Sequence, residues 1–359
     1  MQRISEKTER IYGADLLRVI LSFCVIVLHV MQYGGMRSHA NPEDPGYYIL
    51  WSLGVLLDCT VNCFIILSGF VMYDKRIKYT NIFRIYLTVL YHGLLVTGLF
   101  GIFAPMVVTD AHWINALCPV VQTEFWYFTG YFGLFILMPV LVQGMRALSN
   151  KQADLLALGI VVVFSILPTV SGTDPFYLNN GYSMLWLVVM FLLGTYLKKR
   201  HEVLQLKRGI LIAVYLGCML ITCICVVLSV VFPSFLGMRM IEYTSPTIVL
   251  AAMAIVLLFA SASVPKSAQK FLTFSAPLTL GIYLLHEHPL VRQYLIMDRF
   301  LDILTLPVLL QICAVLGIAA LIWILCFFLE IIRQGFFSLI RIETALKWLE
   351  KRFFKSNDS

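Results

Sequence analysis

Residues 14–32 read ADLLRVILSFCVIVLHVMQ, an apolar run with few polar groups. An α-helix needs about 20 predominantly apolar residues to cross a hydrocarbon core of roughly 30 Å. The run therefore predicts a membrane-spanning helix near the N-terminus. No small-residue cleavage site follows it, and Asp15 and Arg18 interrupt its beginning. We expect a retained first span rather than a secretory signal peptide.

The whole chain has the composition of a membrane protein. Its 359 residues are 60% hydrophobic and 13% charged, with a mean hydropathy of +0.86. In soluble domains about a quarter of the residues are charged. The chain has 27 Lys and Arg residues against 20 Asp and Glu, which gives a net charge of +7. In a membrane protein this excess is typical of basic cytoplasmic loops, so we expect no nucleic-acid partner.

Nine further apolar segments follow the first one, and each is bounded by polar or charged residues. The predicted spans are residues 14–32, 47–73, 82–104, 125–144, 153–171, 183–198, 209–232, 246–263, 276–297 and 305–332. Together they predict an all-α, polytopic integral membrane protein with about ten transmembrane helices.

Lys and Arg residues alternate between the connecting segments. Of the 27, 22 lie in segments that share a side with the N-terminus, whereas the opposite segments hold Arg37, Arg239 and Arg299. Arg18 and Arg292 fall inside spans. Because positive charge accumulates in cytoplasmic loops, the alternation predicts an even number of spans with both termini cytoplasmic.

The C-terminal segment mixes aromatic and aliphatic residues with Lys and Arg. This mixture predicts a basic amphipathic cytoplasmic tail, residues 333–359, that lies on an anionic membrane surface. Residues 1–332 then form the membrane-embedded domain.

The first span carries an unusual set of polar side chains. Asp15, Arg18, Ser22 and His29 recur at helical spacing, so they lie on one face of the helix. Arg18 and His29 are separated by about 16 Å along the axis. Polar groups inside a membrane are costly and indicate function, although Asp15 and Arg18 could instead form a capping ion pair while His29 bonds a neighbouring helix. A neutral imidazole is well suited to accept a proton.

Three further regions carry polar groups near or inside predicted spans. Ser68-Gly69 lies within the second span, where it indicates a close helix contact, space beside a ligand or a local break of the helix. The basic residues after this span are ordinary cytoplasmic charge or a site for the phosphates of a cytosolic cofactor; they are Lys75, Arg76, Lys78 and Arg84. The fourth span begins Glu124-Phe125-Trp126-Tyr127, and its aromatic residues are also typical of a membrane interface.

The ninth span contains His286, Glu287 and His288 in succession, followed by Pro289 and Arg292. Three ionisable residues inside an apolar helix are hard to attribute to packing. Pro289 would also interrupt the helix there. The two His are two residues apart rather than the four of a helical zinc motif, and the nine cysteines show no paired CxxC spacing. We therefore expect no metal.

Together these features resemble the acyltransferase 3 family of integral membrane acyltransferases. The resemblance rests on Arg18 and His29 with ten residues between them, on the segment Phe64 to Phe70 ending Leu-Ser-Gly-Phe, on Phe125-Trp126-Tyr127 with Pro139 downstream, and on Gly281 to His286. The resemblance covers nearly the whole chain. The motifs occur in the same order as in the family, and the predicted number of helices is the ten that the family usually has. The chain is thus identified as similar to a standalone membrane domain without an appended SGNH-type esterase domain.

The resemblance implies a membrane O-acyltransferase. Such enzymes move an acyl group, usually acetyl, from cytosolic acyl-CoA to a hydroxyl of a lipid-linked or cell-surface glycan or of a small molecule. It implies essential roles for Arg18 and His29, with His29 as general base. It also implies acetyl-CoA as co-substrate and a bacterial plasma membrane location, with the lipid bilayer, a glycan or lipid-linked sugar, and a second copy of the chain or glycan-assembly proteins as partners.

The resemblance and the residue patterns together give a set of candidate site residues. The catalytic candidates are His29, Arg18, Asp15, Glu124, Tyr127 and His286; the acyl-CoA contacts are Arg18, Ser68, Lys75, Arg76 and Arg84; and the acceptor contacts are Trp126, Tyr283, His288 and Arg292.

Two alternatives remain open at this stage. A proton-coupled multi-pass transporter could use Asp15, Arg18, His29, His286 and Glu287 as a relay, although no inverted or internal repeat is visible. A structural subunit of a larger assembly would need none of these groups.

Overall fold

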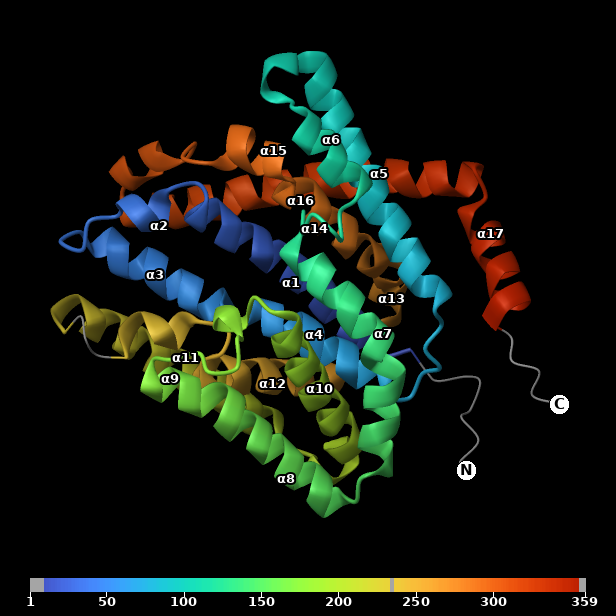
Figure 1. The fold of residues 1–359 in the computed structure, drawn as a ribbon. Coiled ribbons are helices and arrows are strands. Elements are labelled where there is room, and N and C mark those ends of the chain that lie inside the picture. Colours follow the sequence, from blue (N-terminus) through green and yellow to red (C-terminus); the bar gives the residue numbers. More distant parts are fainter. Residues whose placement is uncertain (1–9, 233–235, 355–359) are drawn as a thin grey trace.

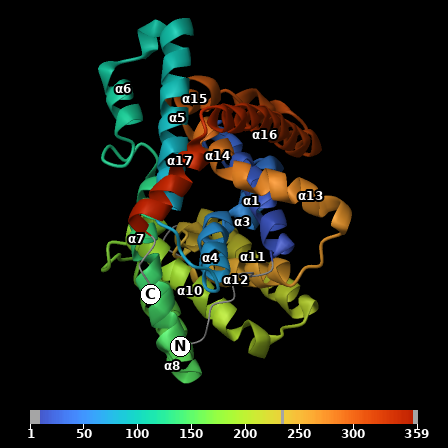
Figure 2. The same cartoon turned by 90° about the vertical axis from the view of Figure 1, so that its right-hand side faces the viewer.

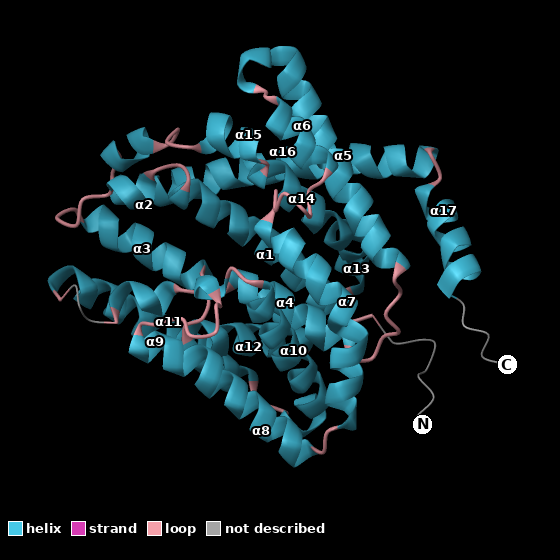
Figure 3. Cartoon of the chain, in the orientation of Figure 1, coloured by secondary structure: helices cyan, strands magenta, loops and turns pink. Residues whose placement is uncertain are grey.

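The computed structural model of the chain describes residues 10–232 and 236–354. Within these ranges the structure is helical and contains no β-strand (Figure 3), which confirms the all-α prediction. Arg3 and Lys7, which contribute to the predicted cytoplasmic charge, and Lys355 of the predicted tail lie outside the described residues.

The helices follow one another with short connections (Figure 1). The α-helices are α1 (Tyr12–Gln32), α2 (Met36–His39), α3 (Pro45–Leu57), α4 (Thr60–Met72), α5 (Thr80–Phe103), α6 (Asp110–Leu117), α7 (Trp126–Ala147), α8 (Asn150–Val161), α9 (Leu167–Ser171), α10 (Met184–Leu204), α11 (Arg208–Val231), α12 (Pro246–Ala260), α13 (Lys266–Ser275), α14 (Thr279–Glu287), α15 (Pro289–Val291), α16 (Val308–Leu339) and α17 (Ile342–Leu349). Short 3₁₀ or π turns are η1 (Pro105–Val107), η2 (Val162–Ile166), η3 (Asn179–Gly181), η4 (Gly237–Ile241), η5 (Ala276–Leu278), η6 (Arg292–Ile296), η7 (Leu301–Thr305) and η8 (Glu350–Phe354).

Helix α1 occupies the middle of the bundle. It packs against α3, α4, α12, α14 and α16, so elements from both halves of the chain surround it (Figures 1 and 2). A tight crossing of α4 and α10 lies beside it. There a Cβ on Gly69 would lie 2.2 Å from the Phe191 carbonyl oxygen. Gly69 therefore serves a close helix contact, as one interpretation of Ser68-Gly69 predicts.

Two of the predicted spans are broken helices. The predicted span 47–73 divides into α3 and α4 at Asp58 and Cys59, where the Thr60 hydroxyl donates a hydrogen bond of 2.5 Å to the Leu57 carbonyl. Such side chains compete with the helical backbone bonds. The predicted span 276–297 begins with η5 and then divides into α14, α15 and η6. Its break after α14 follows from Pro289, which lacks an N–H, and from His288, whose φ of −53° and ψ of 131° leave the helical region.

The structure supports a polytopic membrane protein. Eight helical stretches in the described ranges are long and apolar enough to span a membrane; they are Tyr12–His39, Pro45–Met72, Thr80–Phe103, Trp126–Ala147, Asn150–Ser171, Arg208–Val231, Gly237–Ala260 and Val308–Leu339. The other two predicted spans correspond to α10 and to the broken segment containing α14 and α15. A count of ten spans and the cytoplasmic position of both termini stay predictions.

Contacts between the segment ends follow the predicted alternation. Lys198, in the last turns of α10, lies 3.0 Å from the carboxylate of Asp74, which follows α4. At the opposite end of the bundle, the Tyr33 carbonyl after α1 accepts a hydrogen bond of 2.9 Å from the amide of Asp298 after η6. Segments that the sequence assigns to one side of the membrane thus meet one another.

The C-terminal region differs from the prediction in one respect. Helix α16 continues past residue 332 to Leu339, and Arg333, predicted to begin the exposed basic tail, is buried in it. The reason is Glu330, one turn earlier, whose carboxylate accepts hydrogen bonds of 2.9 to 3.1 Å from the Arg333 guanidinium. Helix α17 follows and packs against α5. Its contact with a membrane surface stays a prediction.

Candidate active site

A cavity of about 960 Å³ follows the polar face of α1. The predicted stripe of Asp15, Arg18, Ser22 and His29 lines it, together with residues of α4, α5, α7 and α14. Residues beyond both ends of α1, Arg10 and Arg37, also line the cavity. Because α1 has 21 residues, the cavity follows a path of about 30 Å. The stripe predicted from helical spacing therefore faces one continuous space.

The end of the cavity near the start of α1 is rich in cations. Asp15 lies 2.5 Å from Arg10 and 3.0 Å from Arg18. Lys75 also lines this end, and burial and the nearby charge of Arg18 lower its pKa. The net charge of the lining residues at this end is positive, since the two carboxylates of Asp15 and Asp74 face Arg10, Arg18, Lys75 and Arg84.

Arg84 belongs to the same end but is already paired. Its Nε and Nη2 donate hydrogen bonds of 2.6 and 2.7 Å to the two carboxylate oxygens of Glu343 on α17. These bonds lower the pKa of Glu343. Arg84 also donates to Asn81 at 2.8 Å. Helix α17 is therefore tied to the rim of the cavity by a bidentate ion pair.

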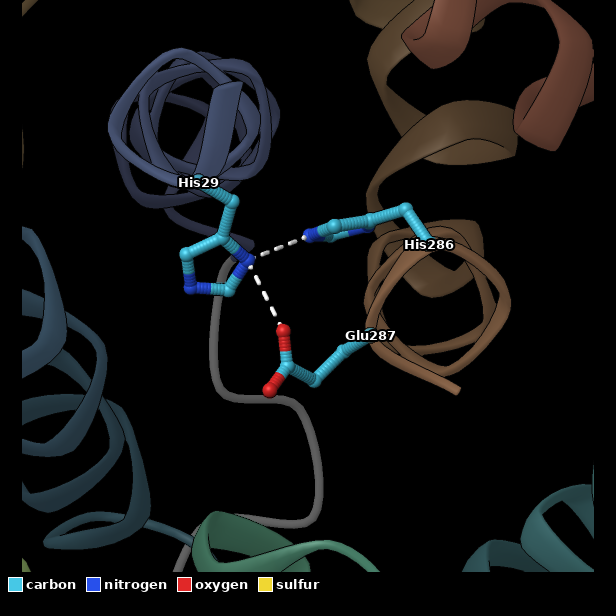
Figure 4. Close-up of side chains that lie close together, drawn as sticks. All are labelled: His29, His286 and Glu287. Carbon is cyan, nitrogen blue, oxygen red and sulfur yellow. Dashed lines mark hydrogen bonds and ion pairs between the residues drawn. The ribbon is translucent and has the colours of Figure 1, made fainter. Parts of the chain in front are cut away.

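His29, His286 and Glu287 meet between α1 and the end of α14 (Figure 4). His29 comes from α1, and the other two come from the end of α14. His29 Nδ1 lies 3.1 Å from His286 Nε2 and 3.0 Å from Glu287 Oε2. Glu287 Oε2 has no well-aligned hydrogen bond among the described residues, so its contact with His29 is mainly electrostatic.

The hydrogen-bond partners assign the tautomers of both histidines. His286 Nδ1 lies 2.7 Å from the Ile282 carbonyl, which only accepts, so His286 carries its proton on Nδ1 and accepts at Nε2. His29 Nδ1 then faces two acceptors and must carry the proton of that ring. Neutral His29 therefore has its lone pair on Nε2, which points away from His286 and Glu287 (Figure 4). A base supported from behind by a carboxylate is the arrangement of many proton-transfer sites.

Two further residues hold Glu287 in place. Arg292 Nη1 donates to Glu287 Oε1 at 2.6 Å, and the Tyr33 hydroxyl donates to the same oxygen at 3.3 Å. The Arg292 guanidinium also lies 5.1 Å from the centre of the Tyr33 ring. The sequence assigned Glu287 to the transporter relay alone and missed Tyr33. The available signal for Tyr33 was its position one helical turn after His29.

Aromatic rings line the rest of the cavity. Tyr127 and Tyr283 meet edge to face with centroids 6.0 Å apart. Trp126 lies 4.6 Å from the ring of Tyr182 and stacks at 6.5 Å with Tyr243. All five line the cavity. The Tyr283 hydroxyl is buried without a hydrogen-bond partner among the described residues.

Four predicted site residues do not line the cavity. Arg76 is exposed beside its rim, and Glu124 is half-buried in the loop before α7, where burial raises its pKa. His288 is buried against Phe125 and accepts a hydrogen bond from the Leu290 amide at the start of α15. Arg292 pairs with Glu287 at 2.6 Å. Of the remaining candidates, Ser68 does line the cavity, although its hydroxyl donates to the Phe64 carbonyl at 2.9 Å.

The central cluster also has the residue types of a metal site. One potential ligand atom from each of His29, His286 and Glu287 lies within 4.8 Å of the others. Arg292, however, already pairs with Glu287 at 2.6 Å, and a second cation beside it would be repelled. We therefore interpret the cluster as a hydrogen-bonded network.

The comparisons with known proteins identify one family, whose model covers most of the chain. The family described as "Acyltransferase domain" matches residues 11–328, a range that contains His29, His286 and Glu287. No curated protein and no solved structure matches the chain.

Proposed function

The chain belongs to the acyltransferase 3 family of membrane acyltransferases, and from this premise we propose that it transfers an acyl group, acetyl in the first instance, from acyl-CoA to a glycan hydroxyl. Acyl-CoA enters at the cationic end of the cavity, and a cell-surface or lipid-linked glycan enters at the opposite end. The family match favours this function over a transporter or a structural subunit. The bacterial plasma membrane, a second copy of the chain and glycan-assembly proteins belong to the same proposal.

The observation that carries the proposal is that His29 lines the cavity, has Nδ1 3.0 Å from Glu287, and makes no hydrogen bond at Nε2 with the described residues. Nε2 takes the proton of the acceptor hydroxyl as its oxygen forms a bond to the thioester carbonyl carbon. The carbon–sulfur bond then breaks, and the imidazolium returns the proton to the leaving thiolate. The Glu287 carboxylate stabilises the imidazolium between these two steps.

The cationic end suits the phosphates of the donor. Arg10, Arg18 and Lys75 line it, and charge-assisted hydrogen bonds from such groups bind phosphate strongly. The distance of about 16 Å from Arg18 to His29 along α1 is one that the extended pantetheine arm of CoA spans. The thioester then reaches His29 while the phosphates stay at the rim.

Tyr283 is suited to the developing oxyanion. Its buried hydroxyl lines the cavity and has no partner among the described residues, and its ring lies 6.0 Å from that of His286. A preorganised donor with no competing partner stabilises negative charge without a cost of reorganisation. Tyr127, packed against Tyr283, helps to orient it.

The proposal is tested by the O-acyl groups of cell-surface glycans. We expect mass spectrometry to detect them in cells that make the wild-type protein or His39→Ala, a variant of an exposed histidine on α2. Cells that lack the protein or make His29→Ala at the same membrane level should lack these groups. Unchanged glycan acylation in the His29→Ala cells would overturn the proposal.

A further inference from the structure

Arg37 is held rigidly although it lies in the short connection between α1 and α3. Its guanidinium carbon lies 4.8 Å from the centre of the Trp51 ring. The guanidinium also fills the space beside Gly54, where the Cβ of any larger residue would lie 1.4 Å from Arg37 Nη2. Helix α3 thus fixes the direction of the Arg37 side chain.

The polar atoms of Arg37 are poorly satisfied. Its Nη2 lies 3.7 Å from Asp58 Oδ2. This distance is close enough for an ion pair but too long for a hydrogen bond. Three of these atoms have no hydrogen-bond partner among the described residues: Nε and Nη2 of Arg37, and Oδ2 of Asp58. The two side chains are only 10% and 9% exposed. Buried groups of this kind are normally paired, so each of these atoms calls for a partner.

The two side chains face the cavity that contains His29. Both line it, at the end opposite to Arg10 and Lys75. Asp58 is near enough to Tyr182 and Tyr243 to interact with both electrostatically. An aromatic wall and a fixed, unsatisfied pair of charged groups therefore share the end of the cavity from which the acceptor enters in our scheme.

We propose that Arg37 and Asp58 form the acceptor subsite and bind the hydroxyl groups of a neutral sugar; this inference rests on the proposed function. A hydroxyl both donates and accepts. One hydroxyl, or two on adjacent carbons, can accept from Arg37 and donate to Asp58 across the 3.7 Å gap. The aromatic rings offer a flat apolar surface for the C–H face of the sugar ring.

The charges select a neutral acceptor. Arg37 and Asp58 cancel each other, and Glu242 also lines this end of the cavity. An anionic sugar would be attracted by Arg37 but repelled by both carboxylates. A neutral sugar meets no such opposition, and it fills the unsatisfied sites on both partners.

The inference is tested by sugar binding to the full-length protein in lipid nanodiscs. The probes are the methyl glycosides of glucose, galactose and N-acetylglucosamine, with methyl glucuronide as the anionic comparison. Binding is followed by tryptophan fluorescence, because the Trp51 ring lies against Arg37. We expect at least one neutral glycoside to bind more tightly than the glucuronide.

Three variants examine the subsite. Gly54→Ala displaces the guanidinium without removing its charge. Asp58→Asn removes the negative charge and replaces one accepting oxygen by a donating amide nitrogen. Arg37→Lys keeps the charge but loses the planar fork. Each should weaken neutral glycoside binding about tenfold or more. The matched control is Gly217→Ala on α11, where an added Cβ meets nothing within 4 Å; it should bind as the wild type does. Size-exclusion profiles identify any variant that does not fold, and Arg37→Lys is the mildest of the three.

The outcomes separate this inference from the proposed function. Acetyl-CoA binding, measured in the same nanodiscs, should be unchanged in all four variants, because the donor enters at the other end. A protein that binds acetyl-CoA but no neutral glycoside overturns the subsite and leaves the donor half of the function standing. Wild-type glycoside affinity in folded Gly54→Ala and Arg37→Lys proteins also overturns it. A protein that binds glycosides through Arg37 but never binds acetyl-CoA would instead contradict the proposed function.

Discussion

Replacing Glu287 by Gln removes a negative charge 3.0 Å from His29 Nδ1 while keeping the size of the side chain. When His29 takes a proton at Nε2, the resulting imidazolium faces this carboxylate. At 3.0 Å and an effective dielectric constant of about 20, their attraction is on the order of 5 kcal/mol. Arg292, 2.6 Å from the same carboxylate, offsets part of it. We expect a net loss of about 3 kcal/mol, which lowers kcat about 100-fold.

The assay for Glu287→Gln is the initial rate of label transfer from [14C]acetyl-CoA to glycan in membrane vesicles. The KM for acetyl-CoA should stay at the wild-type value, because Glu287 is not among the residues that line the cavity. The exposed Glu43, before α3, gives the matched control Glu43→Gln, which should keep the wild-type kcat. Size-exclusion profiles check that the loss of the partner of Arg292 leaves the protein folded. A folded Glu287→Gln protein with wild-type kcat, or with an effect on KM alone, would refute the role of Glu287.

Three further predictions concern the donor end and the helices around the site. Acetyl-CoA affinity should fall as the pH rises through the lowered pKa of Lys75, because only the protonated amine attracts phosphate. Equilibrium binding of acetyl-CoA between pH 7 and pH 10 measures this fall. In the Lys75→Arg variant the pH dependence should be absent. Glu330→Gln should destabilise the protein by about 3–5 kcal/mol. The reason is that Arg333 and His92, which lies 2.8 Å from Glu330, stay buried without the carboxylate that contacts both. An unchanged Tm would contradict this prediction. Asn62→Ala should lower the free energy of unfolding by about 1–3 kcal/mol. The Asn62 amide accepts a hydrogen bond of 2.9 Å from the Trp186 indole and donates one of 2.8 Å to the Tyr243 carbonyl. A Tm equal to that of the wild type would count against this account.

Helical periodicity explains why half of the site was predictable. The stripe from Asp15 to His29 lies on one face of α1 whatever surrounds that helix, so the sequence alone placed these residues together. The cavity confirms their common direction. The run from His286 to His288 likewise indicated a function, because ionisable residues are rare in apolar helices.

The rest of the site depends on packing between distant segments. His29 and His286 are 257 residues apart in the chain, and no local pattern states that α1 and α14 are neighbours. The break after α14 also decides which of three consecutive side chains reaches His29. His286 and Glu287 point toward it, whereas His288 turns to the start of α15.

Charge alone did not identify the buried cations. Arg37 and Arg333 look like loop and tail residues in the sequence, yet the Arg37 side chain is only 10% exposed and Arg333 is buried. Arg37 is accommodated by the absence of a side chain at Gly54. Glu330 neutralises Arg333, and its carboxylate also lies 2.8 Å from His92 Nε2. Each partner lies on another turn or another helix, so a count of charges by segment cannot reveal the pairing.

The most direct test of the account compares donor binding with acyl transfer in purified His29→Ala protein. Our scheme predicts that this variant binds acetyl-CoA with the wild-type Kd, because the phosphates bind at the other end of α1, but transfers no label to the acceptor in a single turnover. Transfer at the wild-type rate by the His29→Ala protein would contradict the claim that His29 is the base.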